Sequence, residues 1–275
     1  GVVKWLSPLL LVALCLALVT VVISSYIRVA ESGAGCEPWP SCYGQYSNNE
    51  NAQGINVLMA KGEQSSYRTE RIIHRLVTST LGGVILFLFI LSWRTKFRII
   101  IGRAVPTALL LLALILALIG PIHPVSPIPI LNLSNFVGGM LLAALIFYLY
   151  QKVSHIGKLP IKTPFPRLIS WGIVLIALQI LWGGWTSANY AGSACDKLLD
   201  CNVLVQHSSS LLDIFNPVNA LLLNQQSQVV IESKMEIIQL IHHYLALVTL
   251  VYFLIIISLI MRTKKRLEQG LRKEC

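Results

Sequence analysis

Three of the six histidines in this 275-residue chain lie near the start of long apolar segments, where polar side chains are costly. They are His74 in one segment and the neighbours His242 and His243 in another. A polar residue in such a segment usually faces a cavity, a partner or a bound group, and imidazole can ligate metals or carry protons. The remaining histidines fall in predicted loops, at His123, His155 and His207.

Small residues follow His74 along one face of its predicted helix. Positions four and eight residues further on share that face, and they hold Thr78 and Gly82, with Gly83 beside them. The face below His242 carries Ala246 and then Thr249, whereas the face below His243 carries leucines at 247 and 250. His74 and His242 therefore each stand above a groove of small residues, and His242 is preferred over its neighbour.

Such a groove has two interpretations. Small residues let helices pack closely, with each histidine bonded to a neighbouring helix. A flat macrocycle also needs a groove beside its axial ligand, and imidazole is a standard ligand of haem iron. Because two grooves occur at matching places in the chain, the pattern favours haem ligation by His74 and His242.

Glu70 lies four residues before His74, on the same helix face and at the edge of the apolar segment. A carboxylate beside a haem could move protons or stabilise a cationic intermediate. It could equally be a helix N-terminal acid favoured by the dipole and paired with Arg71. The sequence leaves both interpretations open.

The segments that carry these residues are those of a membrane protein. The chain is 55% hydrophobic and 12% charged, and six segments approach the roughly 20 apolar residues that a helix needs to span a bilayer. Continuous apolar runs predict helices and exclude barrel strands, which alternate. The predicted spans are Ser7–Ile27, Ile72–Trp93, Ala104–Ile119, Ile130–Tyr150, Leu168–Thr186 and Ile237–Met261.

The net charge of +10 follows the predicted topology and gives no reason to expect nucleic-acid binding. Basic residues concentrate in the loops and termini on one side of the predicted membrane, and such loops are usually cytoplasmic. This predicts that both termini are cytoplasmic and that lipid headgroups contact the helix ends. The first segment is expected to be a retained span in a bacterial inner membrane rather than a signal peptide. Fifteen of the 22 basic residues then lie inside: Lys4, Arg94, Lys96, Arg98, Arg103, Lys152, Lys158, Lys162, Arg167, Arg262, Lys264, Lys265, Arg266, Arg272 and Lys273.

Two C-x5-C pairs follow apolar segments, Cys36 with Cys42 and Cys195 with Cys201. The topology puts both pairs outside, where an oxidising compartment lets them close two small disulfide loops. A zinc site is the weaker alternative, because structural zinc prefers shorter spacing and four ligands. Of the remaining cysteines, Cys15 lies in the first span and another ends the chain.

The two cysteine pairs belong to an internal duplication. With Cys36 aligned on Cys195, Ser24-Ser25 falls on Gly183-Gly184, and each cysteine loop leads into a histidine-bearing helix. The predicted fold is an all-α, polytopic membrane bundle with one complete four-helix half and one shortened half. Its predicted parts are residues 1–151 with the candidate haem site at His74, a cytoplasmic linker at 152–167, the shortened half at 168–262 and a basic cytoplasmic tail at 263–275.

Four motifs resemble the haem A synthase family, which assembles the haem of cytochrome oxidase. They are "GAGCEPWPSCYGQ" (33–45), "TERIIHRLV" (69–77), "QILWGGWTSANYAGSAC" (179–195) and "DIFNP" (213–217). The resemblance implies two four-helix bundles and oxidation of a haem O methyl group to a formyl group. It implies haem O as substrate in the N-terminal bundle and a haem b cofactor in the C-terminal bundle.

Carried over residue by residue, the resemblance makes Glu70 the catalytic acid, His74 a ligand of the substrate haem and His242 a ligand of haem b. It makes Cys36 and Cys42 the outer-loop disulfide. Asn132 stands at the likely position of a second histidine on the family's fourth helix. The family pattern also continues for two more spans, which carry the partner of His242, and it has arginine where His243 stands.

Three functional hypotheses follow. The first is an enzyme that converts haem O to haem A, with haem O synthase, cytochrome oxidase assembly proteins and a second copy of the chain as candidate partners. The second is a non-catalytic haem-binding assembly factor derived from the same family. The third is a membrane thiol–quinone oxidoreductase that uses the outer cysteines. This last hypothesis leaves the histidine grooves unexplained, and the first is preferred.

Overall fold

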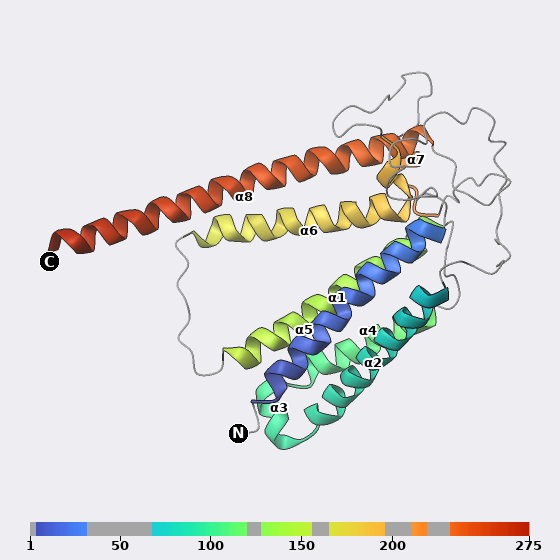
Figure 1. Cartoon of the computed structure of the whole chain (residues 1–275), viewed down its shortest axis with the longest axis horizontal. Coiled ribbons are helices and arrows are strands. Elements are labelled where there is room, and N and C mark those ends of the chain that lie inside the picture. Colours follow the sequence, from blue (N-terminus) through green and yellow to red (C-terminus); the bar gives the residue numbers. More distant parts are fainter. Residues whose placement is uncertain are drawn as a thin grey trace.

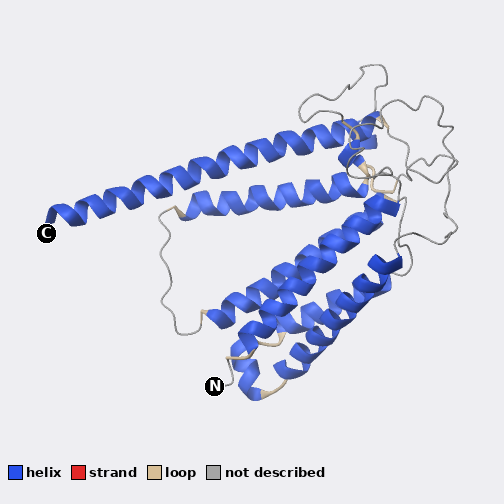
Figure 2. Cartoon of the chain, in the orientation of Figure 1, coloured by secondary structure: helices blue, strands red, loops and turns tan. Residues whose placement is uncertain are grey.

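A computed structural model describes residues 4–31, 68–119, 128–155, 165–195, 211–218 and 232–274. This part of the chain is helical and contains no strand (Figure 2). The predicted all-α class is therefore confirmed. The helices are α1 (Leu6–Glu31), α2 (Arg68–Ser92), α3 (Thr95–Ile101), α4 (Ala104–Ile119), α5 (Pro129–Ser154), α6 (Pro166–Ala188), the 3₁₀ turn η1 (Ala191–Ser193), α7 (Leu211–Ile214) and α8 (Ser233–Glu274).

Each of the six predicted spans corresponds to one helix. Five of these helices, α1, α2, α5, α6 and α8, are individually long and apolar enough to cross a membrane. The third predicted span is α4, whose 16 residues rise roughly 24 Å. It joins α3 through an 85° bend, and the pair counts as a sixth candidate span. The protein is thus a polytopic membrane protein.

The bend between α3 and α4 depends on a glycine. Gly102 has a φ of 72°, in the left-handed region that residues with a side chain seldom adopt, and its N–H donates to Arg98 O at 3.0 Å. The backbone therefore turns sharply as soon as α3 ends. Arg103 follows at once and places its guanidinium 4.2 Å from the ring centre of Trp93, which ties this corner to the end of α2.

The long helices alternate in direction, so the described chain begins and ends at the same end of the molecule (Figure 1). At the opposite end, α1 and α6 finish and α2 and α8 begin, which places His74 and His242 there. We call this the histidine end. That this end is on the outer side of the membrane, and the boundaries of the predicted parts, stay predictions.

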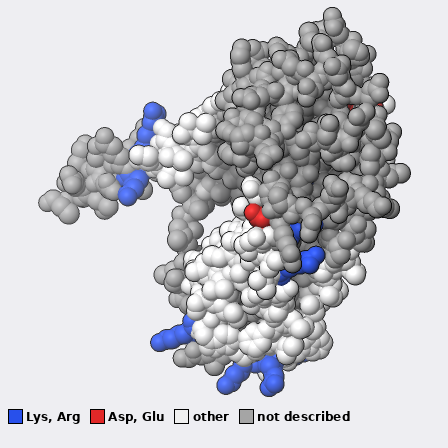
Figure 3. All heavy atoms as spheres, turned by 45° about the vertical axis from the view of Figure 1, so that its right-hand side comes forward, with Lys and Arg blue, Asp and Glu red and all other residues white. Residues whose placement is uncertain are grey.

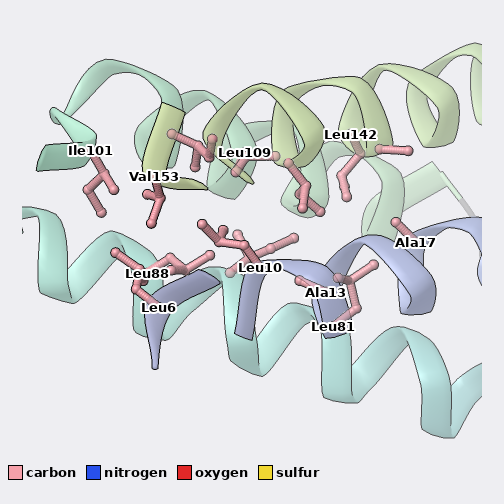
Figure 4. Close-up of a cluster of buried hydrophobic side chains, with 14 residues drawn as sticks. Leu6, Leu10, Ala13, Ala17, Leu81, Leu88, Ile101, Leu109, Leu142 and Val153 are labelled. Atoms are coloured by element: carbon pink, nitrogen blue, oxygen red, sulfur yellow. The ribbon is translucent and has the colours of Figure 1, made fainter. Parts of the chain in front are cut away.

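Helices α1, α2, α4 and α5 form a bundle around one apolar core (Figure 4). Helix α1 contributes side chains spaced four, three and four residues apart, which keeps them on one face. Glycines of α5 allow close approach: a Cβ on Gly138 would lie 2.6 Å from Leu116 of α4, and one on Gly139 would lie 2.9 Å from Val21 of α1. The core residues include Leu6, Leu10, Ala13 and Ala17 of α1, Leu81, Ile85 and Leu88 of α2, and Leu142, Ile146 and Leu149 of α5.

Helices α6 and α8 form a second, smaller unit that packs beside α5 (Figure 1). Indole groups hold it together at the histidine end: Trp182 Nε1 donates to Ile238 O and Trp185 Nε1 donates to Ile214 O, both at 3.0 Å. Gln239 of α8 also donates to Gly192 O at 2.7 Å. Polar side chains therefore fix the register of α8 against α6 where the histidines lie.

The outer surface is apolar along the spans and charged at the helix ends. Large apolar residues of α2, α6 and α8 are exposed along their length, as expected for contact with lipid tails. In Figure 3 the middle of the bundle is uncharged, and Lys and Arg atoms lie at its lower end and beside the grey region.

Candidate functional site

His74 lies on the face of α2 that leads into the bundle core. From His74 the spacing to Thr78, Leu81, Ile85 and Leu88 alternates between four and three residues, and the last three side chains are buried. His74 is half-buried at the top of this stripe. His74 therefore lies in line with the core-facing side chains of α2, and its role as a ligand stays a prediction.

The surface of α2 below His74 is open at its two glycines. A Cβ built on Gly82 or Gly83 would meet no atom within 4 Å. The Thr78 hydroxyl donates to His74 O at 2.8 Å, so it is satisfied within its own helix. Below His74 there is therefore space beside α2 that side chains do not fill. A molecule placed there would not need to form a hydrogen bond with the Thr78 hydroxyl.

Glu70 stands one turn before His74 with an unsatisfied carboxylate oxygen. Among the described residues, its Oε2 atom is buried and has no hydrogen-bond partner. A buried carboxylate oxygen without a donor is unfavourable, so such a group is expected at a place where a proton or a donor arrives from another molecule. The described residues thus leave this acceptor without a donor, and the role of Glu70 stays a prediction.

His242 of α8 faces α6. A Cβ on Gly183 would lie 3.1 Å from His242 Cε1, so glycine is what allows the imidazole to lie against the α6 backbone. One turn earlier on α6, Gln179 Nε2 lies 3.3 Å from His242 Nδ1. The ring is therefore held along one edge by two residues of the same face of α6.

The neighbouring histidine is placed differently. The rings of His242 and His243 are 6.4 Å apart and inclined by 40°. The face below His243 carries the exposed Leu247 and Leu250, whereas Ala246 below His242 is half-buried. His242 therefore has the smaller and more buried neighbours, and its preference as the ligand stays a prediction.

Thr78 of α2 and Thr249 of α8 make the same kind of hydrogen bond. The Thr249 hydroxyl of α8 donates to Leu245 O at 2.8 Å, as Thr78 donates to the carbonyl four residues before it. Each hydroxyl is therefore satisfied within its own helix.

Asn132, at the position where the family motif places a second histidine, is buried and hydrogen-bonded. It is 6% exposed and its Nδ2 donates to Ala188 O at 3.3 Å and to Tyr190 Oη at 3.4 Å. Both acceptors belong to the end of α6 or the residues directly after it. The amide thus links α5 to the second unit, a structural task that a sequence motif could not reveal.

Cys195 is the only member of the two predicted cysteine pairs within the described residues. It is 2% exposed, and its N–H donates to Gln239 Oε1 at 2.6 Å. Cys36, Cys42 and Cys201 lie outside the described part, as do His123 and His207, and the predicted disulfide pairing stays a prediction. No cluster of three metal-ligating side chains occurs among the described residues.

The model of a family described as "Cytochrome oxidase assembly protein" matches residues 7–274 of the chain. The chain belongs to this family. A protein named heme A synthase, from Shewanella oneidensis, is 26% identical over 220 residues, which is 77% of this chain. The match spans 66% of that relative, so the chain covers just under two thirds of its length.

Membership of the cytochrome oxidase assembly family confirms the resemblance found in the motifs, while the contact of Gln179 with His242 comes only from the structure. Gln179 was part of a motif without an assigned role, and its position four residues before Gly183 was the available signal. The contact with His242 joins two helices, and sequence spacing within one helix does not report it.

Proposed function

We propose that this member of the cytochrome oxidase assembly family is a haem A synthase, which oxidises a methyl group of haem O to a formyl group. The observation that carries the proposal is Glu70: a buried, unpartnered carboxylate oxygen one turn from His74, above open space. The family and the name of the Shewanella relative support this activity.

In this proposal His74 ligates the iron of the substrate, and the porphyrin lies along the open groove of α2. The residues fit such a substrate, because Gly82 and Gly83 leave room and the Thr78 hydroxyl is satisfied within its own helix. A bulky side chain at either glycine would fill that room.

Glu70 is the proton acceptor of the proposed reaction. Overall, conversion of a methyl to a formyl group adds one oxygen atom, formally that of water, and releases four electrons and four protons. The electrons leave for an external acceptor. The protons need a base beside the substrate, and a carboxylate within hydrogen-bond reach can accept them.

His242 is the proposed ligand of a haem b in the second unit. That haem, when bound, supplies a route for single electrons. A metal-bound histidine usually donates its second ring N–H to an acceptor that fixes the ring. The amide of Gln179 can supply an oxygen at the observed 3.3 Å, because amide oxygen and nitrogen are assigned from hydrogen bonding. Nε2 is then left to bind iron.

The membrane topology of the proposal places the histidine end outside and both termini in the cytoplasm of a bacterium. The described basic residues of the loops at the other end support this orientation. Haem O then reaches the site from the membrane, with haem O synthase as the candidate supplier. Fusion of alkaline phosphatase after residue 50 should give activity, and fusion after residue 158 should not.

Extraction of haems after co-expression with haem O synthase tests the activity. Haem A in the extract is expected from the wild type, and haem O without haem A from Glu70→Gln. The matched control is Glu232→Gln, because the Glu232 carboxylate is paired with Lys234, with 2.8 Å between Oε2 and Nζ. Only haem b and haem O in the wild-type extract would reject the enzymatic proposal.

That result would favour the second candidate function, a non-catalytic haem-binding assembly factor. The structural observation on its side is Asn132, whose amide is bonded to the end of α6 at the position where the family motif places a second histidine. His74 would then hold a haem without an opposite protein ligand from α5.

A further inference from the structure

A buried arginine lies where the two units meet at the histidine end. Arg28, near the end of α1, is 4% exposed. Its Nη2 donates to Ser187 Oγ of α6 at 2.7 Å and to Ser25 Oγ at 3.4 Å. Its Nε is buried and has no hydrogen-bond partner among the described residues.

The charge of this guanidinium is not matched by a carboxylate. Within the described residues, no aspartate or glutamate forms an ion pair with Arg28, which donates to two neutral hydroxyls. Burial of a cation without an anion is strongly unfavourable. The C-terminal dipole of α1 compensates only part of a full charge. The site therefore favours an anion.

The position of Arg28 limits what that anion can be. The residue lies at the same end as His74 and His242, and its partner Ser187 is on α6. One turn before Arg28, Ser24 accepts a hydrogen bond from Asn135 of α5 at 3.3 Å, so α5 is also close to this part of α1. The unused N–H donors of a planar guanidinium bind the two oxygens of a carboxylate side by side.

We infer that Arg28 binds a carboxylate of the haem held at His74, through its Nε–H and a neighbouring N–H. The inference rests on the proposed function, in which the substrate is a haem, a molecule with two carboxylate side chains. Arg28 thereby fixes how the substrate is turned within its groove. The hydroxyls of Ser25 and Ser187 hold the guanidinium in place for this contact.

Haem and its dimethyl ester test the inference directly, because esterification removes both negative charges and leaves the ring intact. Purified full-length chain carrying His242→Ala, which leaves the His74 site alone, is titrated with each compound and followed by the Soret band. The His242→Ala protein, which retains Arg28, should bind free-acid haem about tenfold or more tightly than the ester. Arg28→Gln should abolish this preference by weakening only free-acid binding, and Arg28→Lys should restore part of it.

The matched control is Arg75→Gln, which removes an exposed arginine beside His74 and should keep the preference. Equal weakening of acid and ester by Arg28→Gln would show a structural role and overturn the inference. A loss of co-purifying anionic lipid in Arg28→Gln, with the acid preference intact, would assign the site to a lipid headgroup and also overturn it. If the parent protein binds neither compound, the proposed haem function itself fails, which is a different result.

Discussion

Arg28 and Ser187 are joined by a 2.7 Å hydrogen bond and stand 159 residues apart. The same separation divides Cys36 from Cys195, so the bond connects equivalent positions of the predicted duplication. Helices α1 and α6 therefore meet at corresponding points near their ends. The equivalence is positional and not chemical: an arginine at one position meets a hydroxyl at the other, so the two units contribute different groups to one junction.

Helix α5 brings the two equivalent helices together at this level. Asn135 donates to Ser24 Oγ of α1, while a Cβ on Gly184 of α6 would lie 2.5 Å from Phe136. In the duplication Ser24 and Ser25 align with Gly183 and Gly184. The small residues of both helices are thus used for close contact with other elements, and Gly183 is used for contact with His242.

Filling the contact between α6 and His242 should affect only the second unit. In Gly183→Val the added carbon atoms meet the imidazole, because even a Cβ would lie 3.1 Å from Cε1. We expect the ring to be displaced and the haem b content per protein to fall at least several-fold. Haem extraction after co-expression with haem O synthase measures this, and unchanged haem b content would contradict the assignment of His242.

The reciprocal substitution should affect only the first unit. Gly83→Leu places a side chain in space where a Cβ meets nothing within 4 Å, so the helix bundle should remain folded. We expect the bound haem O to be lost because the groove below His74 is filled, while haem b is retained. Each of the two glycine variants is the control for the other, and loss of both haems in either would indicate misfolding.

Removing the acceptor on His242 should change the electronic properties of the proposed haem b. Gln179→Leu leaves the imidazole N–H without an acceptor, so the ligand becomes less basic, the oxidised iron is less stabilised and the midpoint potential rises. Haem affinity should fall about 10- to 100-fold. Gln179→Glu should lower the potential, because a carboxylate accepts the N–H more strongly. Redox titration of the purified variants measures both directions, and equal potentials in all three proteins would exclude an orienting role.

The helix ranges and the faces of the grooves could be predicted from the sequence, because both depend on residue type and helical period within one segment. The half-buried face of His242 and the stripe below His74 follow from that period. The contacts of Gln179, Asn132 and Arg28 could not be predicted, because each joins two helices whose relative rotation and depth the sequence pattern leaves open. The sharp bend after α3 could not be predicted either, because a glycine such as Gly102 in a polar connection has many possible conformations.

Asn132 offers a test that separates structural from haem-related roles. Asn132→Ala removes two hydrogen bonds, of 3.3 and 3.4 Å, that link α5 to the end of α6. We expect a loss of about 1 kcal/mol in the free energy of unfolding and a lower midpoint in thermal denaturation. The haem spectrum at 25 °C should be unchanged. A large spectral change at full occupancy would instead mean that the Asn132 amide contributes to the haem site.

The outer cysteines separate the haem proposal from a thiol relay. In Cys36→Ser with Cys42→Ser, a relay that passes electrons through these thiols loses its reactive groups and should lose all activity. If the pair only closes a loop, its loss raises the entropy of the unfolded loop and should weaken haem retention on heating without abolishing haem A formation. Haem A extracted from cells that express the double variant measures the difference. Cys15→Ser is the control, because Cys15 is a free, exposed thiol within α1. Complete loss of haem A in the double variant at normal protein and haem levels would favour the relay.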